Sequence, residues 1–266
     1  MKTISGIDQP LLFAHRGASI EFPENSMAAF ERAVELGVDV IETDAHITAD
    51  GHVVLCHDET GERLASEPKA VADSSLGDVQ SWDIGFNHGA AENERPFASQ
   101  GHCIPTLSEA LSAFPEMRWN IDIKVEGSDA ASHVAEQIRK LGAEQRVLLA
   151  SFSARTLKDI RNQGYLGETG MGRADVVQMA TVPRFIMKGV PPFCPGGHRV
   201  QVPIRSGPFL FASKSFVEKC HRLDKAVDFW TINTESETKM LLELGVDGIM
   251  TDDPRMVKAL FDDLFE

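Results

Sequence analysis

Hydrophobic and polar residues alternate along the chain in two recurring patterns. Short apolar runs, typical of buried strands, occupy residues 11–14, 38–44, 119–125, 147–152 and 227–233, with shorter ones near 53–56, 167–172 and 200–203. Apolar residues that recur every three or four positions predict helices over residues 26–36, 76–82, 106–114, 129–141, 154–162, 213–223 and 254–264. Asn25 is expected to cap the first helix and Gly37 to end it. This alternation of strand and helix predicts a parallel sheet.

An internal repeat narrows the architecture. The stretch LGVDVIETD at residues 36–44 recurs as LGVDGIMTD at residues 244–252, with seven of nine positions identical. Each copy begins at a helix end, turns through glycine and enters a strand, as the units of a barrel do. A length of 266 residues suits one barrel of this kind. The sequence therefore predicts a single domain over residues 1–266, an α/β protein with a (β/α)8 TIM-type barrel. Residues 59–105 lack a sustained period and are expected to be a small insertion after the second barrel strand.

Two carboxylates share one face of the strand over residues 38–44. Glu42 and Asp44 are two residues apart, so their side chains project to the same side. Buried together, they need a cation, a proton or open water. A solvated strand end would be the simple explanation. In the second copy of the repeat, however, Met250 stands where the first has Glu42, so the strand does not require an acid there. That difference favours a functional role.

Further polar residues follow other predicted strands. The run over residues 11–14 ends at His15-Arg16-Gly17, and the strand over residues 53–56 ends at His57-Asp58. We expect the two histidines at the ends of neighbouring strands. The strand over residues 119–125 alternates strictly, which places Asn120, Asp122 and Lys124 on one face and apolar residues on the other. In a barrel the apolar face packs outward against helices. Asp122 and Lys124 would then face inward, as functional groups or as a structural ion pair.

Composition restricts the partners. The formal net charge of −14 disfavours nucleic acid and anionic membranes and suits a protein that attracts a divalent cation. Cys56, Cys103, Cys194 and Cys220 are scattered without metal-ligand spacing, which argues against a zinc site or a disulfide framework. No apolar run reaches the length of a transmembrane helix or a signal peptide, so a cytoplasmic protein without stable membrane association is expected. The basic residues Arg184, His198, Arg199 and Arg205 are expected to be solvated or paired with carboxylates.

The order and spacing of several short motifs resemble those of the glycerophosphodiester phosphodiesterase family. The matching pieces are HRG at 15–17, PEN at 23–25, ExD at 42–44, the DG turn at 50–51, HD at 57–58, the NIDIK strand at 120–124 and the WTxN strand at 230–233. The resemblance implies the barrel fold. It also implies an enzyme, a phosphoric diester hydrolase that converts glycerophosphodiesters to an alcohol and glycerol 3-phosphate.

The resemblance also implies roles for individual residues. Glu42, Asp44 and Asp122 would hold one divalent cation. These hard oxygen donors suit Mg²⁺ or Ca²⁺, and Asp122, where the family more often has Glu, would reach it directly or through a water. His15 and His57 would exchange protons with the substrate, one assisting attack by the glycerol 2-hydroxyl and the other protonating the leaving alcohol. Arg16 and Lys124 would bind the phosphate, and Trp230 would form an apolar wall for the glycerol.

Two other functions remain open on the sequence alone. A related barrel phosphodiesterase could act on lysophospholipid or sphingolipid headgroups and release a cyclic phosphate, since it would share the histidines and the metal site. A non-catalytic binding relative is the other alternative. The sequence also leaves open the preferred alcohol, the choice of cation, which histidine is the acid, whether Asp58 orients His57 or caps the surface, the oligomeric state, and the roles of residues 59–105 and 173–212.

Overall fold

A curled parallel sheet forms the centre of the protein. The computed structural model describes residues 9–90, 94–125, 127–183 and 196–265. Parallel strands follow one another around the sheet in the order β7–β6–β2–β1–β12–β11–β8. Their bounds are Leu11–His15 for β1, Val40–Ile47 for β2, Arg118–Ile123 for β6, Val147–Ala150 for β7, Arg199–Val202 for β8, Ala226–Phe229 for β11 and Gly248–Thr251 for β12.

The sheet closes on itself through a short connecting piece. Parallel bridges join Leu149 of β7 to Thr169, and Gly170 to Arg199 of β8. Residues 169–170 thus stand where a further strand belongs between β7 and β8, and they complete the eight positions of a barrel. The predicted strand over residues 167–172 is reduced to these two bridges. The predicted (β/α)8 architecture is confirmed.

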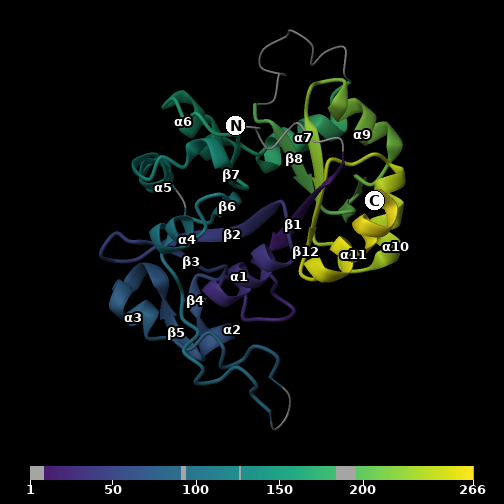
Figure 1. Cartoon of the computed structure of the whole chain (residues 1–266). Helices are drawn as coiled ribbons and strands as arrows, with labels where there is room; N and C mark the ends of the chain where they lie inside the picture. The colour runs from purple at the N-terminus through teal and green to yellow at the C-terminus, as the bar shows by residue number, and fades with distance from the viewer. Residues whose placement is uncertain (1–8, 91–93, 126, 184–195, 266) are drawn as a thin grey trace.

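Helices cover the outside of the sheet (Figure 1). They are α1 Met27–Glu35, α4 Leu107–Ala113, α5 Ser128–Lys140, α6 Ala154–Asn162, α7 Arg173–Thr181, α9 Lys214–His221, α10 Glu235–Glu243 and α11 Pro254–Phe265. Helix α7 was not predicted. Its apolar residues do not gather on one face, and Met179 is its only fully buried residue. A helix of this kind gives no amphipathic signal in the sequence.

Two helix starts show how side chains cap the helices. Thr106 and Glu109 form a capping box at the start of α4, where the sequence predicted a helix over residues 106–114. The prediction for α1 was wrong by one residue, because Ser26 is the cap and its side chain accepts from the amide of Ala29. Asn25 instead has a φ of 55° and is buried, with its side chain bonded to Thr43 and Asp44. An asparagine tolerates this left-handed conformation better than most residues, which frees its amide for contacts with β2.

The segment after β2 leaves the alternation of strand and helix. Strand β3 (Val53–Leu55) pairs antiparallel with β2. It is followed by β4 Thr60–Gly61, α2 Glu62–Ala65, β5 Glu67–Ala70, the 3₁₀ turn Val71–Asp73 and α3 Leu76–Gln80. In Figure 1 these elements lie together below the barrel. They enclose a small apolar cluster of their own, which includes Val54, Val79, Trp82 and Ile104. The expectation that His57 ends a neighbouring barrel strand was therefore wrong: β3 is the return strand of a hairpin.

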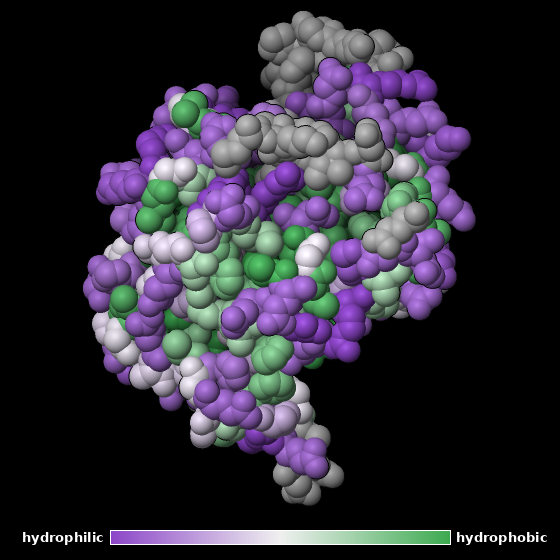
Figure 2. All heavy atoms as spheres, in the orientation of Figure 1, coloured by the Kyte–Doolittle hydropathy of each residue, from purple (hydrophilic) through white to green (hydrophobic). Residues whose placement is uncertain are grey.

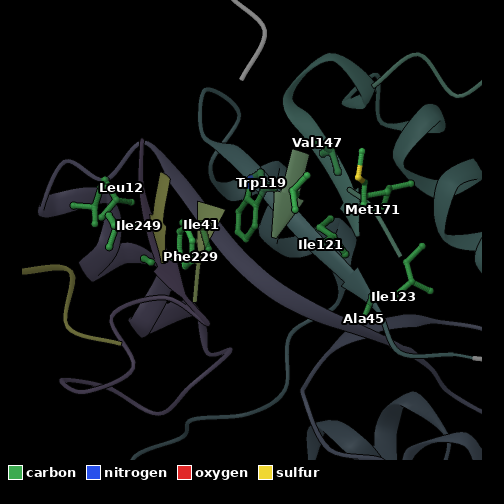
Figure 3. Close-up of a cluster of buried hydrophobic side chains, with 14 of the residues drawn as sticks. Leu12, Ile41, Ala45, Trp119, Ile121, Ile123, Val147, Met171, Phe229 and Ile249 are labelled. Atoms are coloured by element: carbon green, nitrogen blue, oxygen red, sulfur yellow. The ribbon is translucent and has the colours of Figure 1, made fainter. Parts of the chain in front are cut away.

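The main core lies between the sheet and the helices. Ile121 and Ile123 of β6 face outward into this layer, as the alternation predicted, and Figure 3 shows them among other buried side chains of the strands. Phe30 of α1 packs edge-on against Trp119 with ring centroids 5.1 Å apart. Full burial of such side chains stabilises the fold by about 1.5–3 kcal/mol each. The outward layer thus supports the strands whose opposite faces carry polar groups.

On the face seen in Figure 2, hydrophilic residues cover most of the periphery, and hydrophobic residues gather near the centre of the view. Within the described part of the chain, no helix is long and apolar enough to cross a membrane. Cys56, Cys103 and Cys220 are free thiols. Cys194, Arg184 and residues 1–8, which bear on three of the expectations above, lie outside the described residues.

Candidate active site

The HRG motif forms the sharp turn that follows β1. Arg16 and Gly17 both have left-handed backbones, with φ of 59° and 81°. A side chain at Gly17 would bring its Cβ to 2.7 Å from the carbonyl of Ala29 in α1, so only glycine fits this approach. The amide of Arg16 donates to the carbonyl of Glu42 at 2.9 Å. The turn therefore holds His15 and Arg16 against the polar face of β2.

Glu42 and Asp44 lie side by side on the inner face of β2, as predicted, with 4% and 2% of their surfaces exposed. Burial and the neighbouring charge of Asp44 raise the pKa of Glu42 to about 8. The pKa of Asp44 is shifted in the opposite direction. Burial opposes ionisation, but Lys124 and Arg16 outweigh it and lower the pKa of this carboxyl group. Two buried carboxylates this close cannot both be ionised without nearby positive charge.

Arg16 and Lys124 supply part of that positive charge. Arg16 Nε lies 3.3 Å from Asp44 Oδ2. Lys124 Nζ lies 3.0 Å from Asp44 Oδ1 and 2.7 Å from Asp122 Oδ2, so it bridges the two acids. Burial raises the pKa of Asp122 even against the attraction of Lys124. The register of the sheet explains this proximity, because β2 and β6 are parallel neighbours with Asp44 beside Asp122.

His57 reaches the same region by another route. The hairpin of β2 and β3 folds the chain back, and the amide of Cys56 donates to the carbonyl of Asp44 at 3.0 Å. His57 Nδ1 lies 2.7 Å from Asp58 Oδ1. Asp58 therefore contacts the histidine, which answers the question that the sequence left open about this aspartate. The hairpin, rather than a barrel strand, places His57 near the carboxylates.

The inserted segment contributes one residue that the sequence did not suggest. Arg63 of α2 donates to Asp58 Oδ2 at 2.5 Å and to both carboxylate oxygens of Glu24 at 2.7 and 2.8 Å. Glu24 in turn accepts from Arg16 at 2.8 Å. Alternating charges thus link His57 to Arg16 through Asp58, Arg63 and Glu24. A two-pronged guanidinium–carboxylate contact of this kind fixes orientation as well as charge.

His15 is held from a distant part of the chain. Its Nδ1 lies 2.6 Å from Asp252 Oδ1, and its Nε2 lies 3.9 Å from Glu42 Oε2. Burial alone would lower the pKa of His15, but the hydrogen bond to Asp252 and the charge of Glu42 raise it above the ordinary value. Asp252 was not selected from the sequence, although it ends the second copy of the repeat. The comparison of the two copies was the signal that could have found it.

A cleft of about 430 Å³ opens beside these groups, lined by His46, His57, Asp58, Glu59, Thr60 and Lys124. His46 was also missed in the sequence. It follows Glu42 and Asp44 in the same alternation along β2, and that alternation could have indicated it. Its Nε2 lies 3.2 Å from the carbonyl of His57, and burial lowers its pKa. A neutral His46 donating to this carbonyl would support the loop that carries His57.

Trp230 follows β11 and packs against side chains of the barrel interior. Its ring meets Phe152 edge-on, with centroids 6.3 Å apart. Phe152 is 62% exposed, and its ring centroid lies 5.7 Å from Lys124 Nζ. The two aromatic rings thus form an apolar surface beside a cation of the site, which agrees with the expected position of Trp230.

The fit of the site to a cation rests on its donor groups. Within the described residues, no three His, Cys, Asp or Glu side chains are already arranged around one point as metal ligands, and Lys124 stands between Asp44 and Asp122. The buried oxygens nevertheless suit a hard cation. Burial and then the charge of Asp44 raise the pKa of Glu42, so a bound cation would favour the ionised form of this carboxyl group. Asn120 Oδ1, on the same face of β6 as Asp122, is buried without a hydrogen-bond partner among the described residues.

Comparison with known proteins identifies the family. The model of the glycerophosphoryl diester phosphodiesterase family matches residues 15–256, which begin at His15. The chain belongs to this family. A glycerophosphodiester phosphodiesterase of Caldanaerobacter subterraneus is 30% identical over 253 residues, which cover 92% of this chain and 94% of the relative. The predicted class of enzyme, a phosphoric diester hydrolase, is confirmed.

Two other relatives show the breadth of the family. The rat protein named lysophospholipase D GDPD1 is 26% identical, with 94% of this chain and 86% of the relative covered. A phosphodiesterase of Oleispira antarctica, solved in complex with the product sn-glycerol-3-phosphate, has a TM-score of 0.73 and 21% identity, with 95% of this chain and 97% of that chain covered. Because the Oleispira antarctica enzyme is only 21% identical, its structure supports the fold of this chain and nothing further. The family assignment rests on the sequence matches.

Proposed function

We propose that this protein hydrolyses glycerophosphodiesters to an alcohol and glycerol 3-phosphate, using two histidines and a divalent cation. The observation that carries the proposal is the convergence of two carboxylate-bound imidazoles on one cluster of buried acids. His15 Nδ1 lies 2.6 Å from Asp252, and His57 Nδ1 lies 2.7 Å from Asp58. In each ring this leaves Nε2 available to exchange a proton. Two such groups suit a displacement in which one hydroxyl loses a proton and another gains one.

The phosphate would be bound by Arg16 and Lys124. Both cations lie at the carboxylate cluster, and both are partly exposed. A cation held by Glu42, Asp44 and Asp122 would supply further positive charge against the phosphate oxygens. One histidine would take the proton of the glycerol 2-hydroxyl as it attacks phosphorus, and the other would protonate the leaving alcohol, which gives a cyclic phosphate. Water would then attack phosphorus in this cyclic phosphate, with the ring oxygen at C2 as leaving group, and release glycerol 3-phosphate. Trp230 would pack against the carbon atoms of glycerol.

Direct measurement of product tests this function. Purified protein would be incubated with glycerophosphocholine and with glycerophosphoethanolamine, in Mg²⁺, in Ca²⁺ and in chelator, and glycerol 3-phosphate would be assayed. Metal-dependent release from both substrates is the expected result. The His57→Ala variant, purified identically, controls for a contaminating enzyme. A cyclic phosphate seen by phosphorus NMR without glycerol 3-phosphate would instead favour the related phosphodiesterase, and absence of both products would contradict an enzyme of either kind.

Removal of divalent cations is expected to abolish turnover, and Mg²⁺ or Ca²⁺ is expected to restore it. Stability provides a second readout. Without a cation, the pKa of Glu42 is raised from 4.5 to about 8, so protonated Glu42 contributes stability that declines as pH rises through this range. Binding of a cation requires the ionised form. The increase in Tm caused by added cation should therefore be larger at about pH 8.5 than at about pH 6.5.

Glu42→Gln is the matched variant for this experiment, because it keeps the shape of the side chain and removes its proton equilibrium. It should lose both the cation-induced increase in Tm and its dependence on pH. Glu235→Gln, at an exposed residue of α10, should behave as wild type. Full turnover in excess chelator, or an equal increase in Tm in Glu42→Gln, would show that these carboxylates do not bind a cation.

A further inference from the structure

Asp252 and His15 meet across the closure of the barrel. Strands β1 and β12 are parallel neighbours, which brings the end of β12 beside the end of β1 although the two residues are 237 positions apart. The Nδ1 edge of His15 faces Asp252 at 2.6 Å, while Nε2 is directed toward Glu42 at 3.9 Å. The imidazole therefore has one edge against Asp252 and the other toward the carboxylate cluster.

Asp252 is itself restrained from several sides. Asn233 Nδ2 donates to Asp252 Oδ2 at 2.6 Å, and Asn233 Oδ1 accepts from the backbone amide of Asp252 at 3.0 Å. The hydroxyl of Ser19 lies 3.3 Å from Asp252 Oδ1 and 2.9 Å from the carbonyl of His15. A carboxylate held in this way has a defined direction, so the imidazole that donates to it is also oriented.

The internal repeat reproduces this arrangement at a second place. Asn25 precedes Asp44 of the first copy by 19 positions; its Nδ2 donates to Asp44 Oδ2 at 3.1 Å, and its Oδ1 accepts from Thr43 at 2.6 Å. Asn233 precedes Asp252 of the second copy by the same 19 positions and makes the corresponding contacts with Asp252, at 2.6 Å, and with Thr251, at 3.1 Å. Each asparagine directly precedes the cap of a helix of nine residues, α1 or α10. The repeated unit therefore holds an aspartate in place at the end of a barrel strand.

The two aspartates have different partners. Asp44 is directed to Arg16 and Lys124, whereas Asp252 is directed to His15. We propose that Asp252 is a positioning residue for His15, which fixes the proton of the neutral ring on Nδ1 and leaves Nε2 to exchange a proton with the substrate. This inference rests on the proposed function of His15. Asp252 ends the second copy of the repeat, so this copy would also contribute a side chain to the active site.

The alternative is that the His15–Asp252 pair only stabilises the fold, and this alternative predicts a different effect on kcat when the pair is removed. The side chains of His15 and Asp252 are 16% and 30% exposed, and pairs that reach solvent contribute little to stability. If the contact served stability alone, its removal would leave kcat nearly unchanged. If it selects the tautomer, the amide of an asparagine can donate to Nδ1 and move the proton to Nε2. Loss of the orienting aspartate from a histidine in this role lowers kcat by about 10⁴-fold in the best-studied case.

Asp252→Asn is therefore the deciding variant. Its kcat for glycerophosphocholine should fall by about 10²- to 10⁴-fold, with KM changed by less than about threefold. Asp252→Glu, which restores a carboxylate, should recover at least about tenfold of the loss. Nitrogen NMR of the imidazole rings gives an independent readout, in which the neutral ring of His15 carries its proton on Nδ1 in wild type and on Nε2 in Asp252→Asn.

A second histidine–aspartate pair provides the control. His221 Nε2 lies 2.7 Å from Asp247 Oδ2, and both side chains are exposed. Asp247 precedes β12, whereas Asp252 follows it, so the two aspartates stand at opposite ends of this strand. Asp247→Asn should change the resonances of His221 and leave kcat unchanged. Wild-type kcat in Asp252→Asn, or a neutral His15 protonated on Nε2 in wild type, would overturn the inference. The NMR result is obtained with the wild-type protein, so it does not depend on whether any variant folds. Absence of turnover in wild type would instead contradict the proposed function, while the NMR measurement would still judge the geometry of His15.

Discussion

Alanine in place of His15 or of His57 is expected to lower kcat by about 10²- to 10⁴-fold, the usual contribution of one proton-transfer group. The fold should persist, because neither ring belongs to the apolar core. His57 is 36% exposed, and its aspartate partner is the next residue in the chain. His15 ends β1 with its ring directed away from the helical layer and toward Glu42.

The experiment compares steady-state kinetics and thermal unfolding of the two variants with those of wild type. His221→Ala removes an exposed imidazole of α9 and should retain wild-type kcat. Both site variants should unfold within a few degrees of wild type. A near-normal kcat in either one would remove that histidine from the proposed mechanism, whatever the result for the other.

Asp228→Ala is expected to lower the free energy of unfolding more than any other substitution named here. Asp228 accepts from Arg199 Nε at 2.7 Å and from a second nitrogen of the same guanidinium group. Both residues are buried, with Arg199 1% and Asp228 0% exposed. Removal of the aspartate leaves a guanidinium group without its counter-charge in the barrel interior. Such a loss costs about 3–5 kcal/mol, which corresponds to a decrease in Tm of roughly 10 °C for a chain of this size.

A double variant separates the lost pair from the lost packing. Asp228→Leu combined with Arg199→Met removes both charges and should recover most of the stability, since apolar side chains often replace buried ion pairs without loss. Glu235→Ala disrupts the exposed pair with Lys239, and its effect on the free energy of unfolding should stay below about 1 kcal/mol. A decrease in Tm of less than about 2 °C in Asp228→Ala would show that Arg199 finds another partner or reaches water.

The structure bears out one expectation for this pair. The basic residues near β8 were expected to be solvated or paired with carboxylates, and Arg199 is paired with Asp228. This aspartate lies on β11, and both side chains are buried. Strand β8 is paired with β11, and their register sets Gln201 beside Asp228. An apolar run in the sequence does not reveal that a barrel interior can contain an ion pair, because alternation indicates the direction of a side chain and not what it meets.

Local patterns determined much of the fold and part of the site. The alternation along β6 placed Ile121 and Ile123 outward and Asp122 and Lys124 inward, because successive side chains of a strand point to opposite faces. The same rule placed Glu42 and Asp44 together. The helices that the sequence predicted start within a residue or two of their expected positions, and the repeat with the strand–helix order indicated the barrel. These features depend on neighbours in the chain, and the sequence records neighbours directly.

Contacts between distant segments required the tertiary structure. His57 approaches Asp44 because β3 returns antiparallel to β2, and the pattern of three apolar residues is the same for either strand direction. Arg63 meets Glu24 across 39 positions, and His15 meets Asp252 across 237. Such pairs are set by the closure of the barrel and by the path of the insertion, through many weak contacts that no local pattern encodes. Local patterns thus indicated the strands, their faces and most of the candidate site residues, and the tertiary structure was needed to show which carboxylate contacts each histidine.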